Sequence, residues 1–238
     1  MIHKEGVRKS HEALVRGLAN SAHEDGEEEY AMPIVINLPK HDRPHRNDVL
    51  VAAGQAVVAV VLHPRAAANP EFDRWYGKRI RKITRRARNA AWEHVQEVPG
   101  VTVTFDTAQV RAFTPAPVHA TDQRIDKLQI GGTDIPADGC QGSSQGICTV
   151  FIDSSLTMSL GKAAAQVGHA TMLFAAELPA DEAVSWAEAG FPLAVREVDH
   201  EEFVAQCAQR GAVVVRDAGF TEVVPGSCTA VAVPTAAQ

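Results

Sequence analysis

Lys162, Gln166 and His169 are polar residues at a spacing that could assemble a reactive site. In a helix over residues 160–177 they lie within about 60° of one another, opposite an apolar face. Lys162 falls in the first turn, where backbone N–H groups attract anions, so it could hold a phosphate, a carboxylate or a developing oxyanion. His169 could act as a general base. A surface lysine and a hydrogen-bonded structural histidine are the alternatives, and the structural role is the more common one for such a histidine.

Asp217 is the second candidate for chemistry. It ends a β-branched run over residues 212–216 and precedes a turn that contains Gly219 and Thr221. A carboxylate at a strand end can serve a reaction, or it can cap the turn through hydrogen bonds to the backbone. The chain contains no GxSxG, GxxxxGK[ST], GxGxxG or HExxH motif, so triad and nucleotide-driven chemistry lack support.

A basic stretch over residues 74–88 is the candidate for nucleic-acid contact. Eight of its fifteen residues are Lys or Arg. Such a cluster could bind phosphates, and a solvated face is the alternative. The RNA contacts are expected from Arg81, Lys82, Arg85 and Arg86. Residues 141–238 are by contrast acidic, with 4 basic and 11 acidic residues.

Composition places these candidates in a globular protein. The 238 residues are 45% hydrophobic and 22% charged, which suits one large domain or two small ones. The four cysteines form no CxxC pair, so we expect no metal site, no disulfide framework and no cofactor. No apolar run is long enough to span a membrane, and residues 1–20 lack a secretory core segment. We therefore expect a cytoplasmic protein without membrane contact.

The order of the predicted elements divides the chain into four parts. Residues 1–30 are expected to be a polar tail with a frayed helix, residues 31–118 an α/β unit, residues 119–146 a glycine-rich linker and residues 147–238 a second α/β unit. Strands that alternate with helices predict helices packed on a mixed sheet.

An internal repeat relates the two α/β units. Gly54-Gln55-Ala56 parallels Gly168-His169-Ala170, and residues 100–106 parallel residues 211–217, at offsets of 111 to 114. Chance similarity is the alternative to duplication. The repeat favours a strand near residues 79–86 followed by a helix, over a single helix across residues 70–97. A helix of that length is unusual in a globular protein.

Two motifs resemble a known family. Residues 161–170 (GKAAAQVGHA) and 215–227 (VRDAGFTEVVPGS) are similar to the type II peptidyl-tRNA hydrolases, and the resemblance covers about residues 147–236. It implies a mixed four-stranded sheet flanked by helices and metal-independent hydrolysis of the ester that joins peptide and tRNA. The family's functional residues correspond to Lys162, Gln166, Asp217 and Thr221. Family members normally pair as homodimers, so the duplicated chain is expected to be an internal pseudo-dimer.

The chain departs from the family at several positions. Asp153 and Ser155 stand where an Arg and an Asp are usual, and residues 157–162 lack two of the usual lysines. Peptidyl-tRNA remains the expected partner. The alternatives are an RNA-binding protein that has lost turnover and a hydrolase of a different small ester or amide. The first copy has Asp48 in place of Lys162, so it is expected to be inactive.

Overall fold

The computed structural model describes residues 3–20, 28–136, 146–217 and 222–235. The helices are α1 (Lys4–Ala19), α2 (Arg46–Val61), α3 (Pro70–Tyr76), α4 (Ala90–Val95), α5 (Gln123–Asp126), α6 (Leu160–Glu177), α7 (Ala180–Glu188) and α8 (His200–Cys207). The strands are β1 (Tyr30–Asn37), β2 (Arg81–Ala87), β3 (Gly100–Phe105), β4 (Ala108–Phe113), β5 (Ala116–Pro117), β6 (Cys148–Asp153), β7 (Ala194–Val198), β8 (Val213–Arg216) and β9 (Cys228–Pro234).

These elements form two sheets of the same topology. The first has the order β2-β1-β4-β3, with the short β5 also paired to β1, and the second has the order β7-β6-β9-β8. In each sheet one pair is parallel, β1 with β2 and β6 with β7, and the other neighbours are antiparallel. The predicted α/β class with mixed four-stranded sheets is confirmed, and the matching topologies are consistent with a duplicated arrangement. We call β1–β4 with α2–α4 the first unit, and β6–β9 with α6–α8 the second unit.

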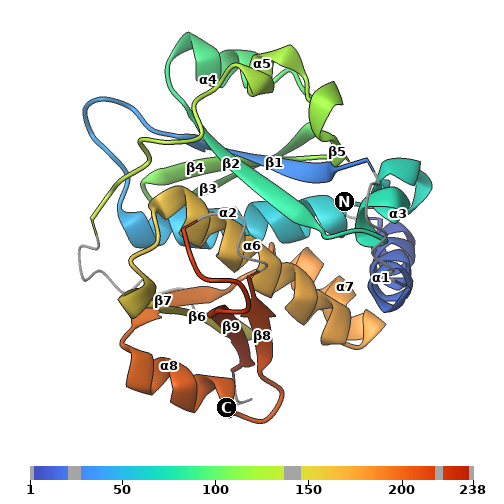
Figure 1. The fold of residues 1–238 in the computed structure, drawn as a ribbon. Helices are drawn as coiled ribbons and strands as arrows, with labels where there is room; N and C mark the ends of the chain where they lie inside the picture. Colours follow the sequence, from blue (N-terminus) through green and yellow to red (C-terminus); the bar gives the residue numbers. More distant parts are fainter. Residues whose placement is uncertain (1–2, 21–27, 137–145, 218–221, 236–238) are drawn as a thin grey trace.

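The two units are stacked in layers (Figure 1). The helices α4 and α5 cover the outer face of the first sheet, α2 and α6 lie between the sheets, and α8 covers the outer face of the second sheet. Alternation along the strands produces these layers, since successive side chains point to opposite faces. Ile34 and Ile36 of β1 join the central core, whereas Val35 joins the outer cluster of α4 and α5. In the second sheet, Phe151 of β6 packs with Phe203 of α8 in a separate outer cluster.

The helices α2 and α6 pack closely through glycines at equivalent positions. A Cβ atom at Gly54 would lie 3.0 Å from Thr171 Cγ2, and one at Gly168 would lie 2.8 Å from Val57 Cγ2. The two contacts are equivalent, because Gly54 and Val57 of α2 correspond to Gly168 and Thr171 of α6 at an offset of 114 residues. Reciprocal contacts of this kind are typical of a two-fold interface, so the packing of the two units is consistent with an internal pseudo-dimer.

The alternative of one helix across residues 70–97 is excluded. This segment contains α3, the strand β2 and the short helix α4. Ile80 has a φ of 40°, which is incompatible with a continuous helix and turns the chain directly before β2. The strand predicted near residues 79–86 is therefore confirmed, with bounds Arg81–Ala87.

The N-terminal segment differs from the frayed tail that was expected. Residues Lys4–Ala19 form the 16-residue helix α1, with Val7 and Leu14 buried in the central core. Arg8 forms an ion pair with Asp181 of α7, and Ser10 Oγ donates to His63 O after α2. Because α1 contacts both units, it belongs to the folded core. The buried face of α1 consists of Val7, Ser10, His11, Ala13 and Leu14.

Candidate active site

The N-terminus of α6 begins where the sequence predicted. Ser159 is the N-cap, and its Oγ accepts a hydrogen bond from Lys162 N at 3.2 Å. This cap fixes the first turn of the helix, so Lys162 is held at a defined point at the edge of the second sheet. Gln166 follows on the same face one turn later.

The structure brings Lys162, Gln166 and Asp217 together. Lys162 Nζ and Gln166 Nε2 each donate to Asp217 Oδ2 at 2.7 Å. The side chains of Lys162 and Asp217 are both only 9% exposed, so the ion pair is largely shielded from water. Such shielding strengthens the interaction relative to a surface pair. The strand β8 supplies the carboxylate directly after its last residue, Arg216, and α6 supplies both donors.

Two further residues support this cluster and were missed in the sequence. Thr229 of β9 is fully buried, and its Oγ1 donates to Gln166 Oε1 at 2.6 Å. This bond fixes the amide so that its Nε2 points at Asp217. Glu222 accepts from Ser159 N at 2.9 Å and from Ser159 Oγ at 2.8 Å, which ties the segment after Asp217 to the start of α6. In the sequence, the only indication of a role for Thr229 was that a polar residue stands in an otherwise apolar strand.

The backbone N–H groups at the start of α6 have partners within the chain. Gly161 N donates to Thr133 Oγ1 at 3.1 Å, Lys162 N donates to Ser159 Oγ, and Ser159 N donates to Glu222. These three N–H groups are therefore engaged within the chain, as is the side chain of Lys162 through Asp217.

Of the other predicted site residues, Thr221 lies outside the described residues. His169 lies two turns from Lys162 and contacts the first unit instead of Asp217. Its Nδ1 is 3.2 Å from Lys82 Nζ of β2. The pKa of His169 is well below its usual value because burial disfavours the charged ring, and positive charge on Lys82 and Lys162 adds to this. The structural role considered for His169 fits this position.

Lys82 is itself buried, at 8% exposure. Its Nζ lies 3.7 Å from Met172 Sδ and 4.8 Å from the centroid of the Trp75 ring. The pKa of Lys82 is well below its usual value, because burial removes the solvation of the ammonium group.

We expect the free energy of unfolding to rise with pH between the lowered pKa of Lys82 and about pH 10.4, where an exposed lysine titrates. In this window the unfolded chain binds a proton that the folded chain does not, so higher pH favours the folded state. Lys82→Met should remove this rise, and the exposed Lys127→Met should retain it. Urea unfolding at several pH values from 7 to 10 measures the slope. An unchanged slope in Lys82→Met contradicts the assignment.

The first unit has a different pair at the equivalent place. Asp48, the counterpart of Lys162 in α2, accepts from Thr107 Oγ1 at 2.7 Å. Thr107 follows Asp106, the counterpart of Asp217, and Asp106 is exposed. In the first unit, the start of α2 is thus linked to the turn after β3 by a hydrogen bond between a carboxylate and a hydroxyl, whereas the second unit uses the Lys162–Asp217 ion pair.

The four residues predicted to contact RNA have partners within the chain. Arg81 forms an ion pair with Glu29, and Arg86 donates to Gly131 O and Gln129 Oε1. Lys82 is buried against α6 as described above. Arg85, at 7% exposure, donates to the carbonyl oxygens of residues 126 and 128 in the segment expected to be a linker. Only Arg81 and Arg86 of the four are partly exposed.

Asp153 and Ser155, where the chain departs from the family, form a local network. Asp153 Oδ1 accepts from Ser155 Oγ at 2.6 Å, and Oδ2 lies 2.7 Å from His200 Nδ1. Burial alone would raise the pKa of Asp153, but the hydrogen bonds from Ser155 and His200 outweigh it and lower the pKa. This carboxylate is held by its own neighbours at the start of η3 (Ser154–Leu156) and α8.

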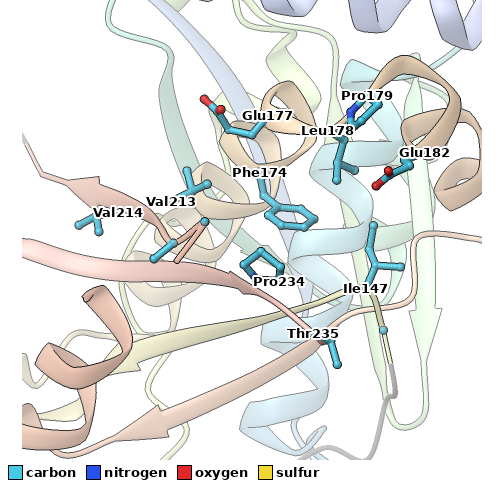
Figure 2. Close-up of a pocket in the computed structure, with 13 residues that line it drawn as sticks. Ile147, Phe174, Glu177, Leu178, Pro179, Glu182, Val213, Val214, Pro234 and Thr235 are labelled. Carbon is cyan, nitrogen blue, oxygen red and sulfur yellow. The ribbon is translucent and has the colours of Figure 1, made fainter. Parts of the chain in front are cut away.

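An apolar groove lies at the other end of α6 (Figure 2). It has a volume of about 940 Å³ and is lined by Ile147, Phe174, Leu178 and Pro234, with Glu177 and Glu182 also on its walls. Phe174 is twelve residues beyond Lys162, or about 18 Å along the helix. The groove is therefore separate from the Lys162–Asp217 pair, and its two carboxylates do not suit an RNA phosphate.

Within the described parts of the chain, no helix is long and apolar enough to cross a membrane. The same residues contain no group of three or more His, Cys, Asp or Glu side chains that could hold a metal ion.

Comparison with known proteins agrees with the C-terminal motifs. Residues 147–238 match the family described as peptidyl-tRNA hydrolase PTH2. The C-terminal part of the chain is therefore a domain of this family, which confirms the resemblance for the second unit, while the match begins only at residue 147. No curated protein and no solved structure matches the chain.

Proposed function

We propose that this protein hydrolyses the ester bond between peptide and tRNA in peptidyl-tRNA, and that the second unit carries the reaction. The observation that carries the proposal is the shielded pairing of Lys162 Nζ with Asp217 Oδ2 at 2.7 Å inside a PTH2 family domain. The reaction as proposed uses no metal and no cofactor. Its proposed place is the cytoplasm, where peptidyl-tRNA arises.

The proposed roles of Lys162, Gln166 and Asp217 rest on their positions, and that of Thr221 rests on the family resemblance. The oxygen of a water molecule oriented by Asp217 attacks the ester carbonyl carbon, the bond to the ribose oxygen breaks, and the proton from water is passed to that oxygen. Lys162 stabilises the negative charge on the carbonyl oxygen or a nearby phosphate. Gln166, itself oriented by Thr229, holds Asp217 in place and with Thr221 positions the ester.

We assign no reaction to the first unit. Residues 31–118 serve in this proposal as a degenerate copy, and residues 119–146 connect it to the domain at 147–238. Asp48 and Thr107 hold the equivalent edge together, but neither supplies a cation.

A tRNA-binding protein without turnover is the second candidate. The observation that favours it is the set of changes at the site, since Asp153 and Ser155 are engaged with each other and residues 157–161 lack lysine. Fewer cations near the ester would weaken stabilisation of the transition state.

Incubation of the purified full chain with peptidyl-tRNA, beside an equal concentration of aminoacyl-tRNA, tests the proposal. We expect release of the peptide and an intact aminoacyl-tRNA. Binding of tRNA without release of peptide would support the second candidate. Cleavage of small esters that tRNA does not inhibit would point to a different hydrolase and contradict the proposal.

A further inference from the structure

The loop between β1 and α2 carries exposed basic side chains of the first unit. Its side chains Lys40, His41 and Arg43 are exposed, and Asp42 between them is an exposed carboxylate. In the described parts of the chain none of these three forms an ion pair, and Arg43 makes only a long contact of 3.5 Å to the carbonyl oxygen of Asp134. Three cationic or titratable side chains therefore face solvent on one short loop.

Arg88 extends this surface. Leu38 N donates to Ala87 O at 2.8 Å, so the residue after β2 lies next to the start of the loop. This follows from the parallel pairing of β1 with β2, because the carboxyl ends of parallel strands meet at one edge of the sheet. Arg88 is partly exposed. We call Lys40, His41, Arg43 and Arg88 the basic edge.

The basic edge lies on the same side of the molecule as the candidate active site. Arg46, which follows the loop, donates to Met158 O at 3.2 Å and to both carboxylate oxygens of Glu197 at 2.8 Å. Met158 precedes Ser159, the residue that caps α6 at Lys162. The N-terminal ends of α2 and α6 accordingly lie close together in Figure 1, with the loop beside them.

The second unit alone offers few positive charges to a polyanion. It contains four basic residues in positions 141–238, and one of them, Lys162, is paired with Asp217. In the stretch over residues 74–88, Lys82 and Arg85 are buried. A substrate with a phosphodiester backbone needs exposed cations near the ester, since phosphate contacts supply most of the sequence-independent affinity.

We propose that the basic edge of the first unit binds the phosphodiester backbone of tRNA while the peptide ester lies at Lys162 and Asp217 of the second unit. This inference rests on the proposed function. It gives the degenerate unit a role in substrate binding, with the reaction left to the other unit.

The test compares two variants that each lose three positive charges. Lys40→Gln/Arg43→Gln/Arg88→Gln removes charge from the basic edge. Lys4→Gln/Lys9→Gln/Arg16→Gln removes it from exposed positions of α1, on the opposite side of the molecule (Figure 1). Each variant is assayed on full-length peptidyl-tRNA and on a peptidyl ester of the short CCA 3′ end.

We expect the basic-edge variant to raise KM for full-length peptidyl-tRNA by at least about tenfold at 0.15 M salt, and to reduce the salt slope of binding by about 0.7 to 0.9 for each lost phosphate contact. Its kcat, and its rate on the short ester, should equal those of the wild type. The α1 variant should match the wild type on both substrates. Equal KM values and salt slopes for the two variants, or an equal loss on both substrates, overturn the inference.

Measuring the affinity for deacylated tRNA tests this inference independently of the proposed function, because this ligand has no ester to cleave. If the wild type cleaves neither substrate, the hydrolase proposal fails, but the affinity for deacylated tRNA still reports on the basic edge. A Kd and a salt slope that do not change in the basic-edge variant then contradict the inference on their own.

Discussion

We expect replacement of Asp217 by Asn to lower kcat for peptidyl-tRNA hydrolysis by about a hundredfold, a loss of about 2.7 kcal/mol of transition-state stabilisation. The amide keeps the shape of the side chain, but it loses the charge that holds Lys162 and orients water. The melting temperature should also fall, since the shielded charge of Lys162 loses its carboxylate partner, so kcat is compared well below the melting temperature of the variant. Single-turnover release of peptide and a melting curve measure the two effects.

Lys162→Met should cause a similar loss, and the double variant should lose little more than either single one, because residues that act as a unit are strongly non-additive. Asp106→Asn in the first unit is the matched control. It should keep the wild-type rate, because the equivalent helix position there is Asp48 and not a lysine. A wild-type rate in Asp217→Asn would remove this carboxylate from the mechanism.

Arg46→Met should lower the free energy of unfolding by about 3 kcal/mol, since removal of one partner leaves the other charge of a buried pair uncompensated. Arg46 and Glu197 have side chains that are 8% and 18% exposed and belong to different units. Arg46 also donates to the carbonyl oxygens of Ile135 and Met158. Urea unfolding measures the change.

Glu197→Met should be destabilising for the same reason, and the double Met variant should be less destabilised than the sum of the two single ones. Exposed Lys9→Met, which removes a surface ion pair with Glu5, is the control and should change stability by less than about 1 kcal/mol. Additive effects of Arg46→Met and Glu197→Met would show that the pair does not couple the units.

The local signals in the second unit were sufficient to predict its elements. The apolar face and the Ser159 cap gave the bounds of α6 directly. The convergence of Lys162 and Asp217 could be expected only from the family resemblance, because 55 residues separate them and their contact depends on where β8 ends. The support from Thr229 depends on the register of β9, which no local pattern specifies.

Basic residues in the first unit were harder to interpret. Eight cations in fifteen residues suggested a surface that binds phosphates. In β2, however, successive side chains point to opposite faces of the sheet. Lys82 is buried on the face that packs against α6, and Arg85 is buried on the face that packs against α5. Their hydrogen-bond partners are 41 to 90 residues distant, so burial could not be inferred from composition. Of the basic edge, only Arg88 belonged to this stretch, and the loop residues Lys40, His41 and Arg43 were not singled out, although their exposure makes them the better candidates.

The polypeptide chain joins the two units covalently, in addition to the packing of Gly54 against Thr171 and of Gly168 against Val57. Dilution therefore cannot separate them, since each half meets the other at the high effective concentration of a tethered partner. In a dimer of identical subunits every substitution appears twice, whereas here it appears once. Lys162 can stand at one helix start while Asp48 stands at the other. A single chain of this form allows one unit to keep the residues proposed for the reaction while the other changes at the same positions, which two identical subunits cannot do.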